Sequence, residues 1–464
     1  MTTRTSLLIL GALALVSAAP AAAQEESASP AGATIGQPGV GSNDSTSATD
    51  SSAAAAATLR AIEIQHFRPQ DQRGLNVFEA PKEEGVPFTG FKLNWGAAFT
   101  QQFQSLSHEN TAPPRVVDGV DRNQLAEIGN GFNNATANLY LNAQLAKGIR
   151  VALTSYLSSR HHNETWVKDG YLLIDDTPIA VPLLQTLMQY VTVKAGHFEI
   201  NYGDQHFRRS DNGNAMHNAF VGNLILDAFT TQIGGEVYVR ANGLMAMGGI
   251  TGGEVRGQVR NPDGRSPAFY GKAGIDRQVS SDLRVRLTGS AFGQAKSLNQ
   301  TLYTGDRAGS RYYSVMDSTQ STESAQPYSG AINPGFRKVT AFQVNPFVKY
   351  QGLELFGVIE QAKGHTAAET SSRTWNQYSG EVVYRFWGER LYTGGRYNVA
   401  SGTLPSMTSD VSVNRSQLSA GWFITPYVLM KGEYVAQKYN DFPTTDVRNG
   451  GRFSGFVVEG VVGF

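Results

Sequence analysis

The chain has 464 residues, no cysteine and a formal net charge of zero from 39 basic and 39 acidic side chains. The lack of cysteine excludes a disulfide framework, a thiolate metal site and a cysteine nucleophile. Nucleic acid favours basic partners, so a neutral chain predicts no nucleic-acid partner. Hydrophobic residues at 41% suit a soluble β-protein and also a membrane barrel, in which only alternate strand residues face lipid.

The first 23 residues have the pattern of a secretory signal peptide. Arg4 is positive, residues 7–16 (LLILGALALV) form a short apolar run, and residues 21–23 (AAA) precede Gln24 as a cleavage site. That apolar run is too short to cross a bilayer as a helix, and no later stretch approaches the roughly twenty apolar residues required. We therefore predict an exported chain that enters a membrane, if at all, as a β-barrel.

Two segments of different character precede the predicted barrel. Residues 24–57 are rich in Ser, Ala, Gly and Thr and lack the apolar content to offset ordering entropy, which predicts a disordered linker. Residues 58–87 set Ile62, Phe67 and Phe78 among charges, so something there should be ordered. This second segment is either a periplasmic plug or a lead-in packed under the barrel rim.

From residue 88 to residue 464 the chain consists of runs in which apolar and polar residues alternate. Tight turns and long polar connections alternate between these runs. Residues 137–145 and 149–157 form one such hairpin around Lys147-Gly148. Short turns on one side and long loops on the other are typical of outer-membrane barrels. The prediction is an all-β, transmembrane antiparallel β-barrel of about 16 strands. These strands are expected at residues 90–106, 134–146, 149–159, 166–175, 190–203, 230–240, 243–255, 267–279, 281–294, 336–350, 352–363, 374–388, 389–400, 411–424, 426–439 and 451–464.

The last fourteen residues (GRFSGFVVEGVVGF) have the pattern of a closing strand. Phe456, Val458 and Phe464 share an apolar face, while Glu459 lies on the other face. A terminal aromatic on such a strand predicts recognition by the barrel-assembly machinery through Phe464. The alternative is the terminal strand of a soluble sandwich.

Phasing the strands places more basic than acidic side chains on the polar faces. A water-filled lumen with excess Lys and Arg favours anions. The alternative is that these side chains pair with carboxylates across strands and hold the wall together. The predicted basic wall of the lumen consists of Arg150, Arg284, Arg286, Arg385 and Arg396.

The third long connection, residues 204–227, is too apolar for a loop exposed to water. Phe220 and Leu224 predict that it folds into the lumen and carries His206, Arg208 and Arg209 to a constriction. Adjacent guanidinium groups match oxyanions bidentately, so these residues are candidates for anion binding. The alternative is a solvated basic turn.

The run VTVKAGHFEINYGDQHFRRSDNG, residues 191–213, resembles the strand-then-loop region of the phosphate-selective porin O and P family. The resemblance implies a sixteen-stranded, usually trimeric porin that passes phosphate or polyphosphate along basic residues. It assigns the constriction to Lys194, Arg208 and Arg209. The chain departs from the family in its many luminal acids and in having no dense arginine ladder.

Enzyme and metal sites find little support in the sequence. Residues 161–164 (HHNE) lack a third ligand at a fixed spacing, and residues 211–214 (DNGN) lack the downstream acid of a calcium loop. No G-x-S-x-G motif is present. We expect no catalytic residue, cofactor or metal.

The sequence therefore predicts a porin in the outer membrane of a Gram-negative-type envelope. Small hydrophilic solutes would pass by diffusion, with a preference for anions that includes phosphate. Its expected partners are small anionic solutes, outer-membrane lipid and two further copies in a homotrimer. Two alternatives are a loop-closed barrel that serves as a surface-binding or envelope-anchoring protein, and a secreted soluble β-protein.

Overall fold

The computed structural model describes residues 59–80, 88–133, 135–159, 165–254, 257, 259–305, 311–321 and 330–464. The predicted signal peptide and Ser/Ala-rich linker lie outside these residues. So do residues 81–87 of the predicted lead-in and the HHNE run at 161–164.

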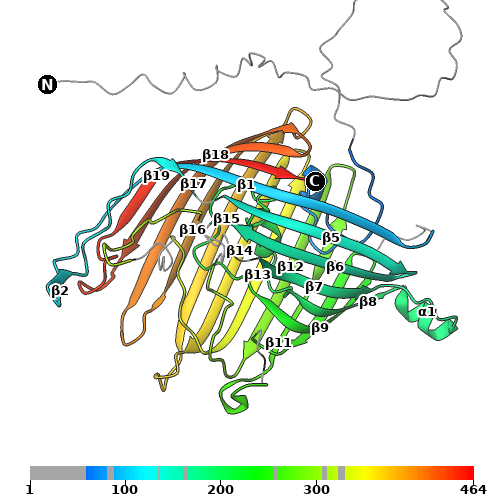
Figure 1. Ribbon diagram of the computed structural model, residues 1–464, viewed down its shortest axis with the longest axis horizontal. Coiled ribbons are helices and arrows are strands. Elements are labelled where there is room, and N and C mark those ends of the chain that lie inside the picture. Colours follow the sequence, from blue (N-terminus) through cyan, green and yellow to red (C-terminus); the bar gives the residue numbers. More distant parts are fainter. Residues whose placement is uncertain are drawn as a thin grey trace, which may run out of the picture. The chain divides into compact units, whose positions relative to one another are not determined.

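Sixteen long antiparallel strands form a closed barrel (Figure 1). Strand β1 pairs with β5 on one side and with β19 on the other, and this second pairing closes the sheet. The strands of the wall are β1 (Lys92–Glu109), β5 (Thr136–Ala146), β6 (Ile149–Ser158), β7 (Trp166–Ile174), β8 (Val191–Glu199), β9 (Thr231–Ala241), β10 (Leu244–Thr251), β11 (Ala268–Gln278), β12 (Leu283–Gln294), β13 (Lys338–Tyr350), β14 (Leu353–His365), β15 (Arg373–Phe386), β16 (Leu391–Thr403), β17 (Asp410–Thr425), β18 (Val428–Asn440) and β19 (Arg452–Gly463).

The predicted antiparallel barrel of about 16 strands is confirmed. Two strands end four residues earlier than predicted, β8 at Glu199 and β10 at Thr251. Beyond Glu199 the chain turns into the lumen. Beyond Thr251 it reaches Gly253, whose φ of 74° is a left-handed conformation that ends the extended run.

Short strands, 3-10 turns and one helix lie in the connections between the barrel strands. The first long connection holds β2 (Val116–Val117), β3 (Val120–Asp121) and β4 (Gly131–Phe132), the last of which pairs with β1. Three 3-10 turns occupy residues 72–74, 205–208 and 262–264. Helix α1 (Pro182–Met188), which the sequence analysis did not predict, joins β7 to β8; Pro182 suits its first turn because proline lacks the N–H that would go unpaired there.

The wall is uneven in height. Strands β5 to β10 have 8 to 11 residues, whereas β13 to β18 have 13 to 16. Figure 1 shows the shorter teal and green strands crossing in front of the longer yellow and orange ones. Strands β7 and β8 pair only from Gly170–His197 to Ile174–Val193, so their ends toward the long loops are not paired with each other.

Alternate residues of the strands face outward and inward. On β19 the side chains of Phe456 and Val458 are exposed, while Val457 and Glu459 are buried. The outward face is apolar, as expected for a surface that contacts lipid. The inward face is buried because other parts of the chain fill much of the lumen.

Three described segments occupy that interior. One lies between β12 and β13, buries Leu302, Tyr312 and Val315, and pairs Arg311 with Glu459 of β19 at 3.2 Å. The connection from β8 to β9, residues 200–230, is called loop 3 here, and its Phe220, Val221 and Ile225 are fully buried. The predicted infolding of the third loop is thereby confirmed. Residues 59–80, called the N-terminal strap, also enter the barrel and bury Phe78. No helix in the described part of the chain is long and apolar enough to cross a membrane.

Candidate functional site

Loop 3 is held on one side of the barrel by a buried acid. Asp204 accepts hydrogen bonds from Arg286 on β12, with Nε–Oδ2 and Nη2–Oδ1 distances of 2.8 and 2.9 Å. Lys272 on β11 and Thr288 on β12 also reach this carboxylate, at 3.0 and 2.7 Å. These contacts fix the start of the loop to the wall.

The opposite side of the barrel holds the loop through a buried lysine. Lys431 on β18 donates to the carbonyl oxygens of Ala215, Asn218 and Phe220, each at 2.9 Å. Glu433, two residues further on, accepts from the backbone N–H of Val221 at 2.8 Å. Because loop 3 is fixed at both sides, it divides the lumen rather than lining one wall.

Arg208 and Arg209 lie inside the barrel, but each is engaged by carboxylates. Arg208 contacts Glu354 on β14 at 3.2 Å and Glu381 on β15 at 3.5 Å. Arg209 makes a bidentate pair with Asp227 of its own loop, at 2.8 and 2.6 Å. Both arginines are buried. An anion would have to displace these carboxylates, which costs several kcal/mol for a buried ion pair, so anion binding by the two arginines stays a prediction.

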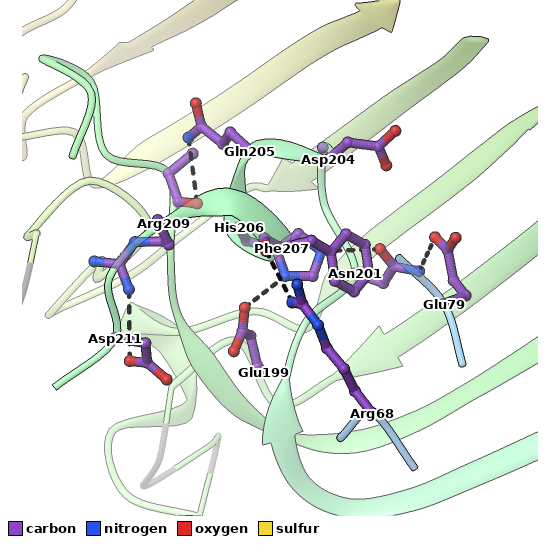
Figure 2. A network of polar contacts seen from close by, with 12 residues as sticks. Arg68, Glu79, Glu199, Asn201, Asp204, Gln205, His206, Phe207, Arg209 and Asp211 are labelled. Atoms are coloured by element: carbon purple, nitrogen blue, oxygen red, sulfur yellow. Dashed lines mark hydrogen bonds and ion pairs between the residues drawn. The ribbon is translucent and has the colours of Figure 1, made fainter. Parts of the chain in front are cut away.

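His206 and Lys194 are less deeply buried than the two arginines. His206 Nδ1 is 2.5 Å from Glu199 Oε1, and its Nε2 is 3.1 Å from Asn201 Oδ1 (Figure 2). Burial lowers the pKa of His206, although Glu199 acts in the opposite direction. Lys194 Nζ lies 3.5 Å from Glu236 and 4.2 Å from the centre of the Phe198 ring.

The five predicted wall arginines all contact carboxylates, which is the pairing that the sequence analysis left open as an alternative. Because every partner is another side chain of the barrel interior, little uncompensated charge remains on this part of the wall. The pairs are Arg150 with Asp175, Arg284 with Asp276 at 2.6 Å, Arg286 with Asp204 and Asp276, Arg385 with Glu354 at 2.6 Å, and Arg396 with Glu381 at 3.2 Å.

Two cavities lie along the short wall of β5 to β9. The inner cavity, of about 250 Å³, is lined by the N-terminal strap, loop 3 and strands β5 to β9. The outer cavity, of about 570 Å³, is lined by Tyr156, Trp166, His197, Phe229 and neighbouring residues at the long-loop ends of β6 to β9. Lys168 lines both cavities.

Lys168 on β7 therefore separates the two cavities. Its Nζ pairs with Asp211 of loop 3 and lies 2.7 Å from Glu199 of β8. The Tyr156 hydroxyl donates to the same Asp211 carboxylate. These contacts join the wall to loop 3 between the two cavities.

The sequence analysis did not single out Lys168. The register between β6 and β7 shifts at Thr154 and Ser155, and this bulge turns both Lys168 and Asp169 inward. Two adjacent charges in a strand interrupt the alternation of apolar and polar residues. That interruption is the feature of the sequence from which the inward position of Lys168 could have been predicted.

The N-terminal strap forms the other side of the inner cavity. It reaches the barrel at the short-turn end, where Gln72 donates to the carbonyl oxygens of Pro426 and Glu389 at 2.9 and 3.1 Å. Further along, the Phe78 ring packs against Phe347 of β13 and Phe207 of loop 3, with centroid distances of 5.2 and 5.8 Å.

Glu79, the next residue of the strap, anchors it by charge. Its carboxylate lies 2.7 Å from Arg286 and 3.3 Å from Lys272, and it accepts from Asn201 at 2.9 Å. The strap thus contacts loop 3 and the wall at the same place.

A closed sixteen-stranded antiparallel barrel with its third loop folded inward is the architecture of outer-membrane porins. No protein-family model and no curated protein matches the chain. Among solved structures, it is similar to an anion-selective porin from Comamonas acidovorans, with TM-score 0.50, 11% identity and coverage of 81% of this chain and 100% of that one.

Two further similar structures have lower scores. The trimer form of OmpT from Vibrio cholerae has TM-score 0.48 and 8% identity over 81% of this chain and 100% of that one. OprB from Pseudomonas putida has TM-score 0.47 and 10% identity over 81% of this chain and 94% of that one. At such identities the likeness concerns the fold alone.

Proposed function

We propose that the chain is a porin of the outer membrane, exported by its signal peptide, through which small hydrophilic solutes diffuse. The observation that carries the proposal is the pair of cavities that meet at Lys168, one toward the short-turn end and one toward the long-loop end of the same wall. The route of diffusion follows β6 to β9 and not the centre of the barrel.

The passage admits small solutes with a preference for anions. The Lys168 contacts keep it narrow, and buried charges act strongly in a narrow site of low dielectric. The chain shares its fold with the anion-selective porin of Comamonas acidovorans, so the sign of its charge selectivity is the first property to measure. Membership of the phosphate-selective porin O and P family, with phosphate as a solute, is part of the proposal and rests on residues 191–213, including Lys194.

The remaining partners are proposed from the fold and the resemblance. The exposed apolar side chains of the strands would contact outer-membrane lipid. A homotrimer is the assembly that the resemblance implies. The β19 strand would be recognised during assembly together with Phe464, which follows it and exchanges backbone hydrogen bonds with Ala97 at 3.0 Å.

A second candidate function is a closed barrel that anchors or binds at the envelope surface. The observation in its favour is the filled interior, in which loop 3 and the N-terminal strap bridge the walls through Asp204, Lys431 and Glu79. In this case the paired charges would serve only to hold loop 3 and the N-terminal strap in place.

Swelling of proteoliposomes separates the two functions. Vesicles that contain the purified protein are placed in isotonic solutions of solutes of increasing size, and light scattering reports solute entry. A porin predicts rapid swelling with small solutes and a steep decline as solutes grow beyond the size of the inner cavity. Swelling no faster than in protein-free vesicles, with a folded barrel, would favour the anchoring function.

A further inference from the structure

The wall of the barrel has a seam between β7 and β8. The ladder between these two strands ends at Gly170 and His197. Beyond that point, toward the long loops, residues 166–169 of β7 pair with β6, residues 198–199 of β8 pair with β9, and neither set pairs with the other. The seam is this stretch of the wall in which two neighbouring strands lack their backbone hydrogen bonds.

Side chains bridge the seam on its inner side. The Asp169 carboxylate accepts a hydrogen bond from the backbone N–H of Glu199 at 3.2 Å. Lys168 Nζ lies 2.7 Å from the carboxylate of the same Glu199. The two strands are therefore held together here by side chains, which move more readily than a ladder of backbone hydrogen bonds.

The outer cavity lies at this seam and is lined in part by residues of the barrel interior. Tyr156 of β6 donates from its hydroxyl to Asp211 of loop 3. Phe229, at the end of loop 3, has its ring centre 4.1 Å from the guanidinium of Arg209. Both rings are buried.

Other residues that line the same cavity lie on the outward face of the wall. Val167 of β7 is 53% exposed. His197 of β8 lies directly opposite Ile233 of β9, which is 47% exposed, and directly opposite residues share one face of a sheet. A cavity lined from both faces of one sheet passes through that sheet, so the outer cavity opens onto the surface that would contact lipid.

The apolar outer surface of the barrel reaches the foot of the seam. One row of cross-strand partners runs from Leu153 through Gly170 and His197 to Ile233. Leu153 and Ile233, at the two ends of the row, are exposed and apolar. Gly170 has no side chain, and a methyl group in its place would meet only Leu153, at 3.8 Å. Hydrocarbon that packs against this row has room to reach the cavity.

The lining of the outer cavity suits an apolar occupant. Trp166, Val167 and Phe229 supply apolar surface. The polar groups are already engaged, since His197 Nε2 lies 3.1 Å from the Thr231 hydroxyl and the Lys168 ammonium pairs with acids. A hydrated solute would lose hydrogen bonds to water without recovering them here, whereas an apolar chain has none to lose.

We propose that the outer cavity binds an acyl chain of an outer-membrane lipid, which enters through the seam between β7 and β8. The cavity volume of about 570 Å³ falls within the range of roughly 300–1,000 Å³ that ligand pockets occupy. A bound chain would also fill the gap beside strand edges that lack a ladder, a costly feature next to lipid. The site does not depend on the proposed channel, but a chain bound there would narrow the proposed passage at its long-loop end.

Photocrosslinking from lipid tests the proposal. Full-length protein is reconstituted in phosphatidylcholine vesicles in which a small share of the lipid carries a diazirine midway along one acyl chain. After illumination, mass spectrometry of peptides locates the label. Outward-facing residues are labelled in any barrel, so the informative residues are those of the interior.

We expect label on Tyr156 and Phe229 of the unaltered protein. Tyr392 of β16 is the internal reference, because it is a buried interior tyrosine that packs in a different cluster. Label on Tyr156 should exceed that on Tyr392 by about tenfold or more, since lipid has no access to the interior where the ladder is complete.

A matched pair of variants tests the route of entry. Val167→Trp places a large ring at the lipid-facing mouth and should lower the label on Tyr156 to roughly a fifth or less, because a filled space excludes the chain. Val237→Trp on β9 is the control: Val237 is 46% exposed and lies outside the described set of residues that line the cavity. Tryptophan is common on the outer surface of membrane proteins, so this control should keep its label within about twofold. Heat-modifiable electrophoretic mobility checks that each variant is a barrel.

Label confined to outward-facing residues of the unaltered protein would overturn the proposal, as would an equal loss of label in the two tryptophan variants. Equally strong labelling of Tyr156 by a short, water-soluble diazirine would also overturn it, by assigning the cavity to water. Swelling of the same proteoliposomes reports the channel separately. Interior label without swelling would keep the lipid site and reject the channel, and swelling without interior label would do the reverse.

Discussion

At the scale of single residues, Arg208 shows how a charge in the lumen can serve structure. It lies between Glu354 and Glu381, and Arg385 and Arg396 approach the same two carboxylates from the wall. Removal of one member of a buried charge network leaves its partners uncompensated.

Arg208→Glu should therefore destabilise the barrel and not simply reverse selectivity. A third carboxylate beside Glu354 and Glu381 is expected to cost about 3–5 kcal/mol, the range for breaking a buried ion pair. Unfolding by guanidinium, followed by heat-modifiable mobility, measures the loss. Arg277→Glu on β11, whose exposed guanidinium donates to the Asn242 carbonyl, is the control. Equal stability of the two variants would contradict this role for Arg208.

His217 of loop 3 makes the inner structure sensitive to acid. Burial lowers the pKa of His217 well below its usual value, and the nearby Arg68 lowers it further. The unfolded chain then binds the proton more readily than the folded one, so the free energy of unfolding falls as pH drops below about 6.5. The Nε2 atom of His217 lies 3.4 Å from the Asp71 carbonyl oxygen, a contact that favours the protonated ring and offsets part of this effect.

We expect His217→Gln to reduce this acid sensitivity. Stability measured at pH 7.5 and pH 5 should differ less in the variant than in the unaltered protein. An identical pH dependence in both would assign the effect to other groups.

The roles of these residues were only partly accessible from sequence. The apolar content of residues 204–227 predicts that Arg208 and Arg209 enter the lumen, since Phe220 and Leu224 need burial. Their carboxylate partners lie in the loop itself and on strands β14 and β15, which are remote in the sequence. Only the structure shows that these carboxylates lie within ion-pair distance of the two arginines.

At the scale of elements, the N-terminal strap is the part whose removal should change the passage most. Phe78 holds it by packing against Phe347 and Phe207, and Glu79 adds ion pairs at the same place. Closure of the barrel depends instead on the pairing of β1 with β19. The strap can therefore be displaced without opening the wall.

Phe78→Ala should loosen the strap and raise channel conductance. Loss of a buried aromatic ring costs about 3–5 kcal/mol. Alanine also offers no new charge partner to Arg284 and Arg286, whose guanidinium groups lie 5.5 and 4.3 Å from the ring. Single-channel recording in planar bilayers measures the change. Ile62→Ala is the matched control, because Ile62 is 42% exposed on the same strap, and its conductance should stay that of the unaltered protein. Equal conductance in all three proteins would show that the strap does not limit the passage.

The positions of strands were predictable where apolar and polar side chains alternate regularly. Strands β13 to β18 bury every second residue over most of their length, so their positions follow from the pattern of polarity. The alternation fails at β7, where a bulge turns adjacent charges inward, and at α1, whose residues are too few for a helical period to stand out. The filling of the lumen by the strap depends on tertiary contacts and was one of two open interpretations.

The barrel as a whole is asymmetric. Loop 3 spans the lumen, the far wall is packed against it, and the open space follows the shorter strands β5 to β9. A solute should therefore meet one side of the barrel only. The absence of native cysteine makes this claim directly accessible, because a single introduced thiol has no competitor.

The most direct measurement is block of single-channel current by a charged thiol reagent. Thr154→Cys places the thiol on β6 at the inner cavity, and Ser379→Cys places it on β15, on the far side of the strand order. The reagent should reduce the current through Thr154→Cys and leave the current through Ser379→Cys unchanged. Block of Ser379→Cys with none of Thr154→Cys would contradict this prediction, and so would the absence of any current through the unaltered protein.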